Sequence, residues 1–339
     1  YRDAIYAVDW TYGTIYAIHL TPEGAGYRGE REAFLYGAPL PVTDAVIGAD
    51  GAMYVVTGGR GMESNLYRVR YTGPGRAVQG PGNDTPEAKK ARAVRRGLEE
   101  FHGVEDKMAL AKAWPHLGSE DRWLRHAARV AVESQPVGQW ANKVLKEKDA
   151  QARITGAVAL ARMGKPGHRA KLIASLLEME PEDLSEEQFL GLLRAYALTF
   201  IRLGSPTAEE RNAVIAELDG FLPSRSSDLN TELMRLLVYL RAPGVIDKGM
   251  ALIASRGKPE VPDWTELASR SQQYGGTVQT MLDNYPPTKA LGYAFMLRNL
   301  KKGWSLDQRR EYFEFLNAAA KGAGGASYPG FMEKIRAEA

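Results

Sequence analysis

The spacing of hydrophobic residues in this sequence changes once, and the change divides the chain into a β-strand part and an α-helical part. Up to Gly73, apolar and polar residues alternate, as in LYRVRY at 66–71, which is the period of a half-buried β-strand. From Glu87 onward, apolar residues recur at the 3.6-residue period of an α-helix. Residues 74–86, PGRAVQGPGNDTP, are rich in Gly and Pro and are predicted to be a linker. The sequence therefore predicts an α+β multidomain chain.

The β part, residues 1–73, shows an internal repeat. We predict six strands, at residues 4–8, 14–20, 27–35, 43–48, 52–57 and 65–71, with a tight turn at Asp50-Gly51. AIYAVDWTYGTIYAIHL and AMYVVTGGRGMESNLYRVRY share the form A-φ-Y-x-V and begin 48 residues apart. Spacing of this kind is typical of β-propeller blades, which have about four strands each. Residues 1–73 are predicted to be a partial β-propeller of about one and a half blades.

Residues 87–258 read as a succession of amphipathic helices with short loops between them. The helix pairs recur about every 30–40 residues, which is typical of an α-solenoid. Asp121 with Arg125 and Asp149 with Arg153 repeat one pattern, followed by small residues, as in HEAT-like repeats. We interpret these residues as a structural ladder between repeats. VGQWANKVLKEK, residues 137–148, is predicted to form one helix of about three turns.

Helix-start signals place further helices at both ends of this region. Thr85 and Pro86 are predicted to be the N-cap and first residue of the first helix. Residues 259–339 are less regular, with Ser305 as a further predicted N-cap. A glycine-rich connector then precedes a last helix, and we expect this segment to lead toward a further domain that the chain does not contain.

Composition excludes several classes of site. The chain has no Cys, so disulfides, thiolate metal sites and attachment of haem c within it are excluded. Its five His form no metal-binding motif, and no metal site is predicted. A net charge of +3 gives no argument for a nucleic-acid partner, and no apolar run is long enough for a membrane span. The chain starts without Met in a strand pattern, which indicates a fragment of a longer protein.

The β part resembles a known family. DAIYAVDWTYGTIYAIHLTPEGAGY, PLPVTDAVIGADGAMYVVTGGRG and LYRVRYTG look like the end of the quinoprotein dehydrogenase-like propeller in the secreted haem-binding propeller-plus-HEAT proteins of planctomycetes and verrucomicrobia. GGASYPGFMEKIRAEA resembles the segment before their cytochrome domain, whose CxxCH motif is absent here. The resemblance implies a periplasmic or secreted protein whose full-length form holds haem c or pyrroloquinoline quinone, with no cofactor held within this chain alone.

The resemblance implies a scaffold that docks a quinoprotein-like propeller against a c-type cytochrome partner or domain. The partners would be an upstream propeller segment or another subunit. Two alternatives stay open: part of a sugar or alcohol dehydrogenase active site, or a non-catalytic protein-interaction module. Whether the chain belongs to an enzyme stays open with them, and no catalytic residue is predicted.

In the resembling propellers, ligand-facing residues lie at the ends of inner strands. On that pattern, Asp44 and Arg60 are the predicted cofactor-binding residues. The alternative for Arg60 is a turn residue paired with Glu63 or solvent, and for Asp44 it is a bond to the backbone amides of a neighbouring blade. Asp9 and Trp10 either shape a channel mouth or form an Asx-turn with an aromatic packed between blades. Three tryptophans are read as core packing, with an aromatic groove as the alternative: Trp114, Trp123 and Trp140.

Overall fold

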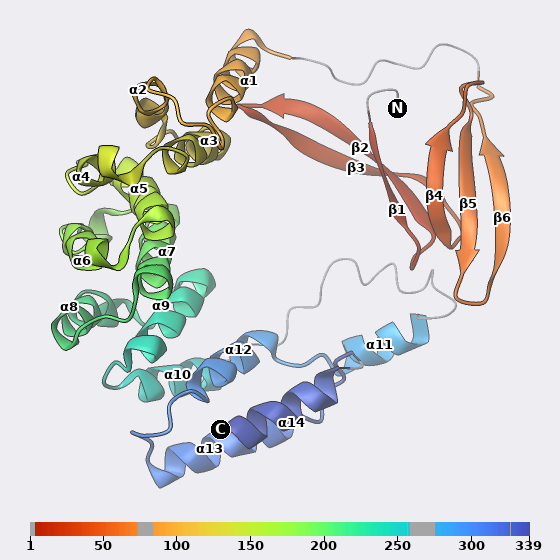
Figure 1. Ribbon diagram of the computed structural model, residues 1–339. Coiled ribbons are helices and arrows are strands. Elements are labelled where there is room, and N and C mark those ends of the chain that lie inside the picture. Colours follow the sequence, from red (N-terminus) through yellow and green to blue (C-terminus); the bar gives the residue numbers. More distant parts are fainter. Residues whose placement is uncertain (1–3, 74–83, 256, 258–274, 326) are drawn as a thin grey trace. The chain divides into compact units, whose positions relative to one another are not determined.

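The computed structural model describes residues 4–73, 84–255, 257, 275–325 and 327–339, and these residues form an α+β structure (Figure 1). Most of the predicted linker, residues 74–83, and residues 258–274 of the C-terminal region lie outside the described residues. The described chain divides into two compact units. The β unit is built around residues 4–73, and the helical unit contains most residues from Lys90 onward.

The β unit contains two three-stranded antiparallel sheets, with strand orders β1-β2-β3 and β4-β5-β6. All six predicted strands are confirmed, most of them shifted or lengthened by a few residues at the ends. They are β1 (Ile5–Asp9), β2 (Thr14–Glu23), β3 (Gly26–Tyr36), β4 (Val42–Ile47), β5 (Met53–Gly59) and β6 (Met62–Val69). Within the described residues, neither sheet closes into a barrel.

Local side-chain chemistry explains where these strands turn. Asp50 Oδ1 accepts a hydrogen bond from Ala52 N at 3.1 Å, and Gly51 has φ +77°. The predicted Asp50-Gly51 turn is therefore confirmed. Gly13, before β2, has φ +62°, and a Cβ at this position would lie 2.4 Å from Gly37 O. Only glycine fits this turn without moving the backbone.

The two sheets share one small core. Ile15, Val42, Met53 and Val55 are buried together, each 5% exposed or less, and come from both sheets. β1 lies beside β4, so the first strands of the two sheets meet. Four buried residues are few for a sheet pair, and the outer faces remain open to further packing.

The described residues contain fourteen α-helices, of which α11 belongs to the β unit and the others lie wholly or mostly in the helical unit. They are α1 (Pro86–Glu99), α2 (Ala109–Ala113), α3 (Arg122–Glu133), α4 (Ala141–Val144), α5 (Ala150–Met163), α6 (Arg169–Leu176), α7 (Glu186–Leu203), α8 (Ala208–Leu218), α9 (Ser227–Leu240), α10 (Val245–Ala254), α11 (Gly275–Asp283), α12 (Thr288–Leu297), α13 (Leu306–Ala319) and α14 (Tyr328–Glu338).

Helices α3, α5, α7 and α9 pack side by side in chain order, with α2, α4, α6 and α8 along one side of that row (Figure 1). α9 also packs against α12, and α12 and α14 each pack against α13. One hydrophobic core runs through all of them, from Leu98 to Ile335. Each of these helices contributes buried residues to this core, which explains the 3.6-residue period of the sequence.

Helices α3 and α5 begin in the same way. Asp121 and Asp149 are their N-caps and accept hydrogen bonds from backbone N–H groups of the first turn. Arg125 donates to Ser119 O at 2.8 Å, and Arg153 donates to Glu147 O at 2.6 Å. Each arginine thus binds a carbonyl six residues before it and ties the helix to its preceding loop, as expected of a structural role.

The other predicted caps are also found. Ala88 N donates to Thr85 Oγ1 at 3.1 Å at the start of α1. Ser305 caps α13 by accepting from Gln308 N at 3.1 Å, and Gln308 Oε1 accepts from Ser305 N in return. This reciprocal pair is a capping box. The last helix, α14, follows the glycine-rich segment as predicted.

The segment at 137–148 differs from its prediction of one helix of three turns. It consists of a 3₁₀ turn at Val137–Gln139 and the four-residue helix α4. Trp140, between them, has φ −130°, which is outside the helical region. Its fully buried ring donates from Nε1 to Gln135 O at 3.1 Å. Burial of this ring in the core outweighs the local helical preference.

Candidate functional site

Two of the residues singled out in the sequence meet where turns of the two sheets come together. Trp10 lies in the turn between β1 and β2, and Arg60 lies in the turn between β5 and β6. Trp10 Nε1 donates a hydrogen bond to Gly58 O at 2.7 Å. The Arg60 guanidinium lies over the Trp10 ring, 5.5 Å from its centroid. We call this contact the Trp10–Arg60 corner.

An Asx-turn positions the indole ring. Asp9 Oδ1 accepts hydrogen bonds from Thr11 N at 2.9 Å and from Tyr12 N at 3.1 Å. This arrangement fixes the chain just after β1 and directs Trp10 to the second sheet. Both parts of the structural interpretation of Asp9 and Trp10 are therefore confirmed: the Asx-turn and the aromatic packed between the sheets.

The turn that carries Arg60 has an unusual backbone. Gly58, Gly59 and Gly61 have φ values of +138°, +92° and +79°, and Arg60 between them has φ +49°. Few non-glycine residues adopt this conformation, and it costs free energy where they do. A Cβ at Gly58 would lie 2.4 Å from Ser64 Oγ, so glycine is required there. The turn brings the backbone close to the Trp10 ring.

The corner has the chemistry of an anion-binding site. A guanidinium presents planar N–H donors that match a carboxylate or a phosphate, and stacking on an indole limits the orientations it takes. The strained turn and the ring together orient Arg60. The ring contact is one feature that positions Arg60. Its pairing with Glu63 or solvent and its role in cofactor binding stay predictions.

Asp44 lies elsewhere in the β unit. It is exposed on β4, opposite Val56 of β5, and its Oδ1 accepts from Ala45 N at 2.8 Å. Val56 lies three residues before Gly59, about 10 Å along the strand. Asp44 thus binds a backbone amide of its own strand, and the structure does not bring it to the Trp10–Arg60 corner. Its role in cofactor binding also stays a prediction.

The hydrogen bond from Trp10 should contribute measurably to the β unit. Replacing Trp10 with phenylalanine keeps an aromatic ring for Arg60 but leaves Gly58 O without the indole donor. We expect the protection of the β5 amides against hydrogen exchange to fall by about 1 kcal/mol. Trp123→Phe, on α3 of the helical unit, is the control and should leave these amides unchanged. Unaltered β5 protection in Trp10→Phe would contradict the assignment.

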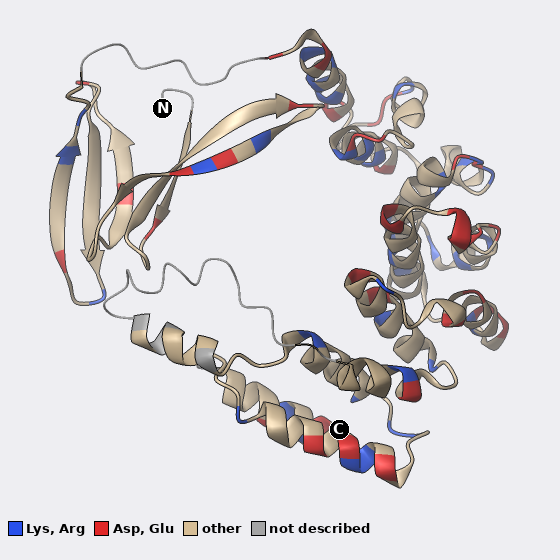
Figure 2. Ribbon diagram, turned by 180° about the vertical axis from the view of Figure 1, so that it is seen from behind, with Lys and Arg blue, Asp and Glu red and all other residues tan. Residues whose placement is uncertain are grey.

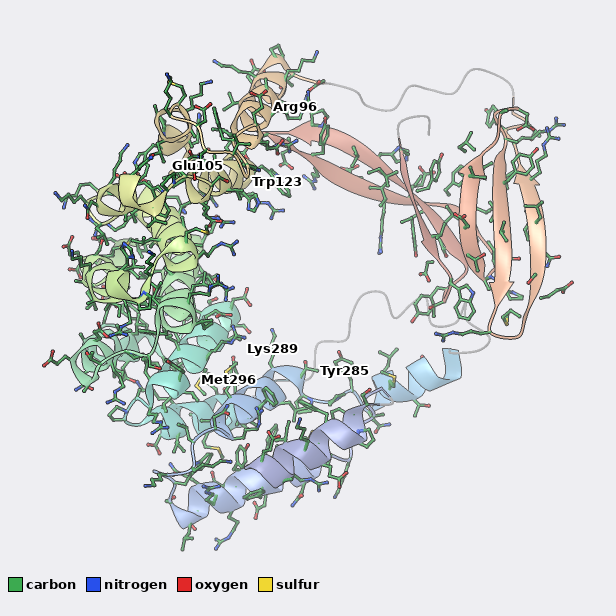
Figure 3. All side chains as sticks on the ribbon, viewed as in Figure 1. Arg96, Glu105, Trp123, Tyr285, Lys289 and Met296 are labelled. Atoms are coloured by element: carbon green, nitrogen blue, oxygen red, sulfur yellow. The ribbon has the colours of Figure 1, made fainter. Side chains whose placement is uncertain are left out.

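The three clustered tryptophans do not form one aromatic groove. Trp140 is fully buried, whereas Trp114 packs at the edge of the core and donates from Nε1 to Glu147 Oε2 at 2.8 Å. Lys143 lies over the Trp114 ring at 4.0 Å. Trp123, labelled in Figure 3, is 41% exposed on α3. Two of the three are thus structural, as the sequence indicated.

A buried acid in the helical unit was not singled out from the sequence. The Tyr196 hydroxyl on α7 donates to Glu217 Oε2 on α8 at 2.7 Å, and Glu217 Oε1 is buried without a hydrogen-bond partner. The pKa of Glu217 is raised to about 7, mainly by burial and to a smaller extent by the charges of Glu180 and Glu182, against the lowering effect of the Tyr196 hydrogen bond. Because the unpartnered oxygen is shielded from solvent, we assign this acid an effect on stability.

Glu217 should make the helical unit more stable in mild acid. Its pKa in the folded chain is about 7, above the ordinary value of 4.5, so the folded state binds the proton more tightly. The resulting stabilisation is complete below pH 4.5 and is lost as the pH rises toward 7. We expect Glu217→Gln to remove this pH dependence and to stabilise the unit at pH 8 by about 1–2 kcal/mol, after allowance for partial exposure.

The measurement is urea unfolding at pH 5 and pH 8, followed by helical circular dichroism. Glu209→Gln, an exposed position on the same helix, is the matched control. Tyr196→Phe should act in the opposite direction, since it removes the hydrogen bond that lowers the pKa of Glu217. An equal pH response in the wild type and in Glu217→Gln would refute the assignment.

The described part of the chain contains no helix long and apolar enough to cross a membrane, and no group of three or more His, Asp or Glu side chains placed to hold a metal ion. Comparisons with protein-family models, with curated proteins and with solved structures found no match.

Proposed function

We propose that this chain is the scaffold and binding portion of a periplasmic or secreted redox protein. Its β unit would be part of a quinoprotein-like propeller, and its helices a HEAT-like α-solenoid that docks the propeller against a c-type cytochrome partner or domain. The observation that carries the scaffold role is the pair of apolar outer faces on the β unit.

On the outer face of the β4-β5-β6 sheet, Val46, Val56 and Leu66 are 63%, 42% and 68% exposed. Residues directly opposite each other on neighbouring strands point to the same face of the sheet, so Leu66 of β6 lies beside Val56 of β5. On the outer face of the other sheet, Ile5 is 54% exposed and pairs with Ile18. Apolar surface on both outer faces favours packing against further sheets, as between propeller blades.

The equivalence of the two sheets also supports the propeller interpretation. Each is an antiparallel meander of three strands, and their first strands, β1 and β4, lie side by side. In a propeller, the first strands of successive blades are the innermost ones and are neighbours. The helical row supports the HEAT-like interpretation in the same way, through the repeated cap and arginine at the starts of α3 and α5.

The redox setting rests on the sequence resemblance. The Trp10–Arg60 corner favours the dehydrogenase alternative, because an oriented guanidinium suits an anionic cofactor or substrate. A non-catalytic interaction module is the second alternative. The three readings differ in what the purified chain should do, so that one set of assays separates them.

As a scaffold, the purified chain should bind a c-type cytochrome and show no dehydrogenase turnover. Turnover is assayed with pyrroloquinoline quinone, Ca²⁺, a panel of aldoses and a redox dye, and binding by calorimetry at two salt concentrations. Dye reduction above the rate without protein would favour the dehydrogenase. Absence of both activities would leave the non-catalytic module.

A further inference from the structure

Helices α5, α7 and α9 pack side by side (Figure 1), and side chains tie their C-terminal ends together. Arg202, in the last turn of α7, donates to Arg162 O in the last turn of α5 at 3.4 Å. The Tyr239 hydroxyl, in the last turn of α9, donates to Ser205 Oγ, just after α7, at 3.4 Å. We call this end of the helical row the C-terminal strip, which consists of residues 160–167, 200–207 and 237–244.

Each of the three helices exposes one large apolar side chain in the C-terminal strip. Met163, Ile201 and Tyr239 are 44%, 70% and 48% exposed. Single exposed apolar residues are common on protein surfaces, whereas three at the ends of neighbouring helices form one patch. Packed helices lie about 8–10 Å apart, so this patch extends about 16–20 Å across the row.

All the charged residues of the C-terminal strip are basic. They are Arg162, Lys165, Arg202 and Arg241, and each of them is exposed. The helix dipole favours cations near helix C-termini, but it does not account for the apolar side chains exposed beside them. The strip therefore combines positive charge with a continuous patch of apolar surface.

Ion pairs within the helical unit neutralise only part of this charge. Arg162 pairs with Glu133 at 2.9 Å, but Glu133 is buried and also pairs with Arg129. Among the residues that the structure describes, Arg202 and Arg241 form no ion pair. A ligand that brings carboxylates to these arginines therefore gains ion pairs without breaking existing ones.

We propose that the C-terminal strip binds an extended acidic segment of a partner protein that has an apolar residue at every third position. A polyproline II segment has three residues per turn and rises about 3.1 Å per residue, so every third side chain recurs on one face after about 9 Å. This repeat matches the spacing of packed helices, so three such side chains lie against Met163, Ile201 and Tyr239 together. Carboxylates between them pair with the basic side chains. A segment that is already extended before it binds loses little conformational entropy.

A second copy of this chain fits the C-terminal strip less well. The acidic segment of a copy is residues 178–187, which carry six acidic and no basic residues (red in Figure 2). Within it, Met179 and Pro181 are buried and Leu184 is half-buried. This segment therefore offers carboxylates without the exposed apolar side chains that the strip also requires. The combination of both features identifies the occupant as a different protein.

This inference goes beyond the redox scaffold proposed above, because it needs only the ends of three packed helices. Binding of the segment and binding of a cytochrome are measured separately, and failure of either proposal leaves the other standing.

The test uses the full chain and the blocked peptide Leu-Pro-Glu-Phe-Pro-Glu-Leu-Pro-Glu, in which every third residue is apolar. We expect saturable binding by calorimetry, with a Kd below about 1 mM that rises with salt. The rearranged peptide Leu-Phe-Leu-Pro-Pro-Pro-Glu-Glu-Glu has the same composition. It should bind at least about tenfold more weakly, because its adjacent apolar residues do not reach three helices. The methyl NMR signal of Met163 should shift during titration with the first peptide.

Two variants test the two features of the C-terminal strip. Ile201→Glu replaces an exposed apolar side chain with a carboxylate that repels the peptide, and should weaken binding at least about tenfold without changing the helical circular dichroism. Leu306→Glu, at an 84% exposed leucine on α13, is its matched control. Arg202→Glu should also weaken binding, whereas Arg310→Glu, at a 70% exposed arginine on α13, should not.

Several results would overturn the proposal. The peptide fails to bind, or binds Ile201→Glu as tightly as the wild type, or binds without shifting the Met163 signal. Equal binding of the rearranged peptide would exclude the spacing, and equal binding of the lysine analogue Leu-Pro-Lys-Phe-Pro-Lys-Leu-Pro-Lys would exclude the acidic character. Self-association of the chain that the peptide displaces and Arg202→Glu abolishes would identify a second copy as the occupant.

Discussion

Replacing Trp140 with alanine is expected to lower the free energy of unfolding of the helical unit by about 4–5 kcal/mol. The side chain is fully buried, and truncation of a buried tryptophan leaves a large cavity that costs about 3–5 kcal/mol. The change also removes the indole donor from Gln135 O, a buried acceptor bond worth about 1 kcal/mol. Urea unfolding of the full chain, followed by helical circular dichroism, measures the loss.

Trp123→Ala is the matched control, because it removes the same side chain at a position that is 41% exposed. The Arg122 guanidinium lies over its ring, 4.5 Å from the centroid. We expect a loss of about 1 kcal/mol or less. Equal losses of unfolding free energy in Trp140→Ala and Trp123→Ala would mean that Trp140 is not buried in the core of the helical unit.

Replacing Arg153 with methionine is expected to cost about 3 kcal/mol. The residue is 5% exposed, and its guanidinium donates to Glu147 O at 2.6 Å and to Ser175 O at 3.0 Å. Methionine retains the apolar stem but leaves two carbonyl groups without these donors, each at a cost of about 1–3 kcal/mol. The ion pair with Glu178 adds little, because that carboxylate is 60% exposed.

Arg310→Met provides the control for charge alone. Arg310 and Asp307 form an ion pair whose side chains are 70% and 83% exposed, and such pairs contribute about 0–1 kcal/mol. Arg153→Lys separates charge from geometry, since one ammonium group replaces the planar fork that reaches both carbonyls. We expect Arg153→Lys to lower the free energy of unfolding by less than Arg153→Met does. Wild-type stability in Arg153→Met would show that the hydrogen bonds from Arg153 to Glu147 O and Ser175 O do not stabilise the helical unit.

Local features of the fold were predictable because a few neighbouring residues determine them. The Asp50-Gly51 turn depends on the Asp50 side chain and on a positive φ at Gly51, and the identities of these two residues are enough to predict it. The helix starts at Thr85 and Ser305 need only an oxygen that accepts from a nearby N–H.

Features that depend on packing between distant residues were not predictable in the same way. α4 is short because Trp140 leaves the helical conformation to enter the core, and periodicity contains no information on that competition. Glu217 was missed for the same reason: its pKa depends on burial between α7 and α8. The only sequence signal was an acid within the apolar pattern of a helix.

The candidate site combines a local feature that the sequence indicated with a contact between distant residues that it did not. The glycines around Arg60 indicated close approach of the backbone to another group, and the structure identifies that group as Trp10, 50 positions earlier in the sequence. No local pattern connects the two residues, because their contact requires the two sheets to stack. Asp44 was chosen by analogy with the ends of inner strands, and its position opposite Val56 separates it from the corner.

The spacing between α3 and α5 is set partly by a glycine. A Cβ at Gly118 would lie 2.6 Å from Asp149 Oδ1, the atom that caps α5. The loop before α3 therefore approaches the start of α5 as closely as a bare backbone permits. Any side chain at position 118 would push the loop before α3 away from the start of α5, and a larger side chain would push it further. The residue at this single position thus limits how closely α3 and α5 approach one another.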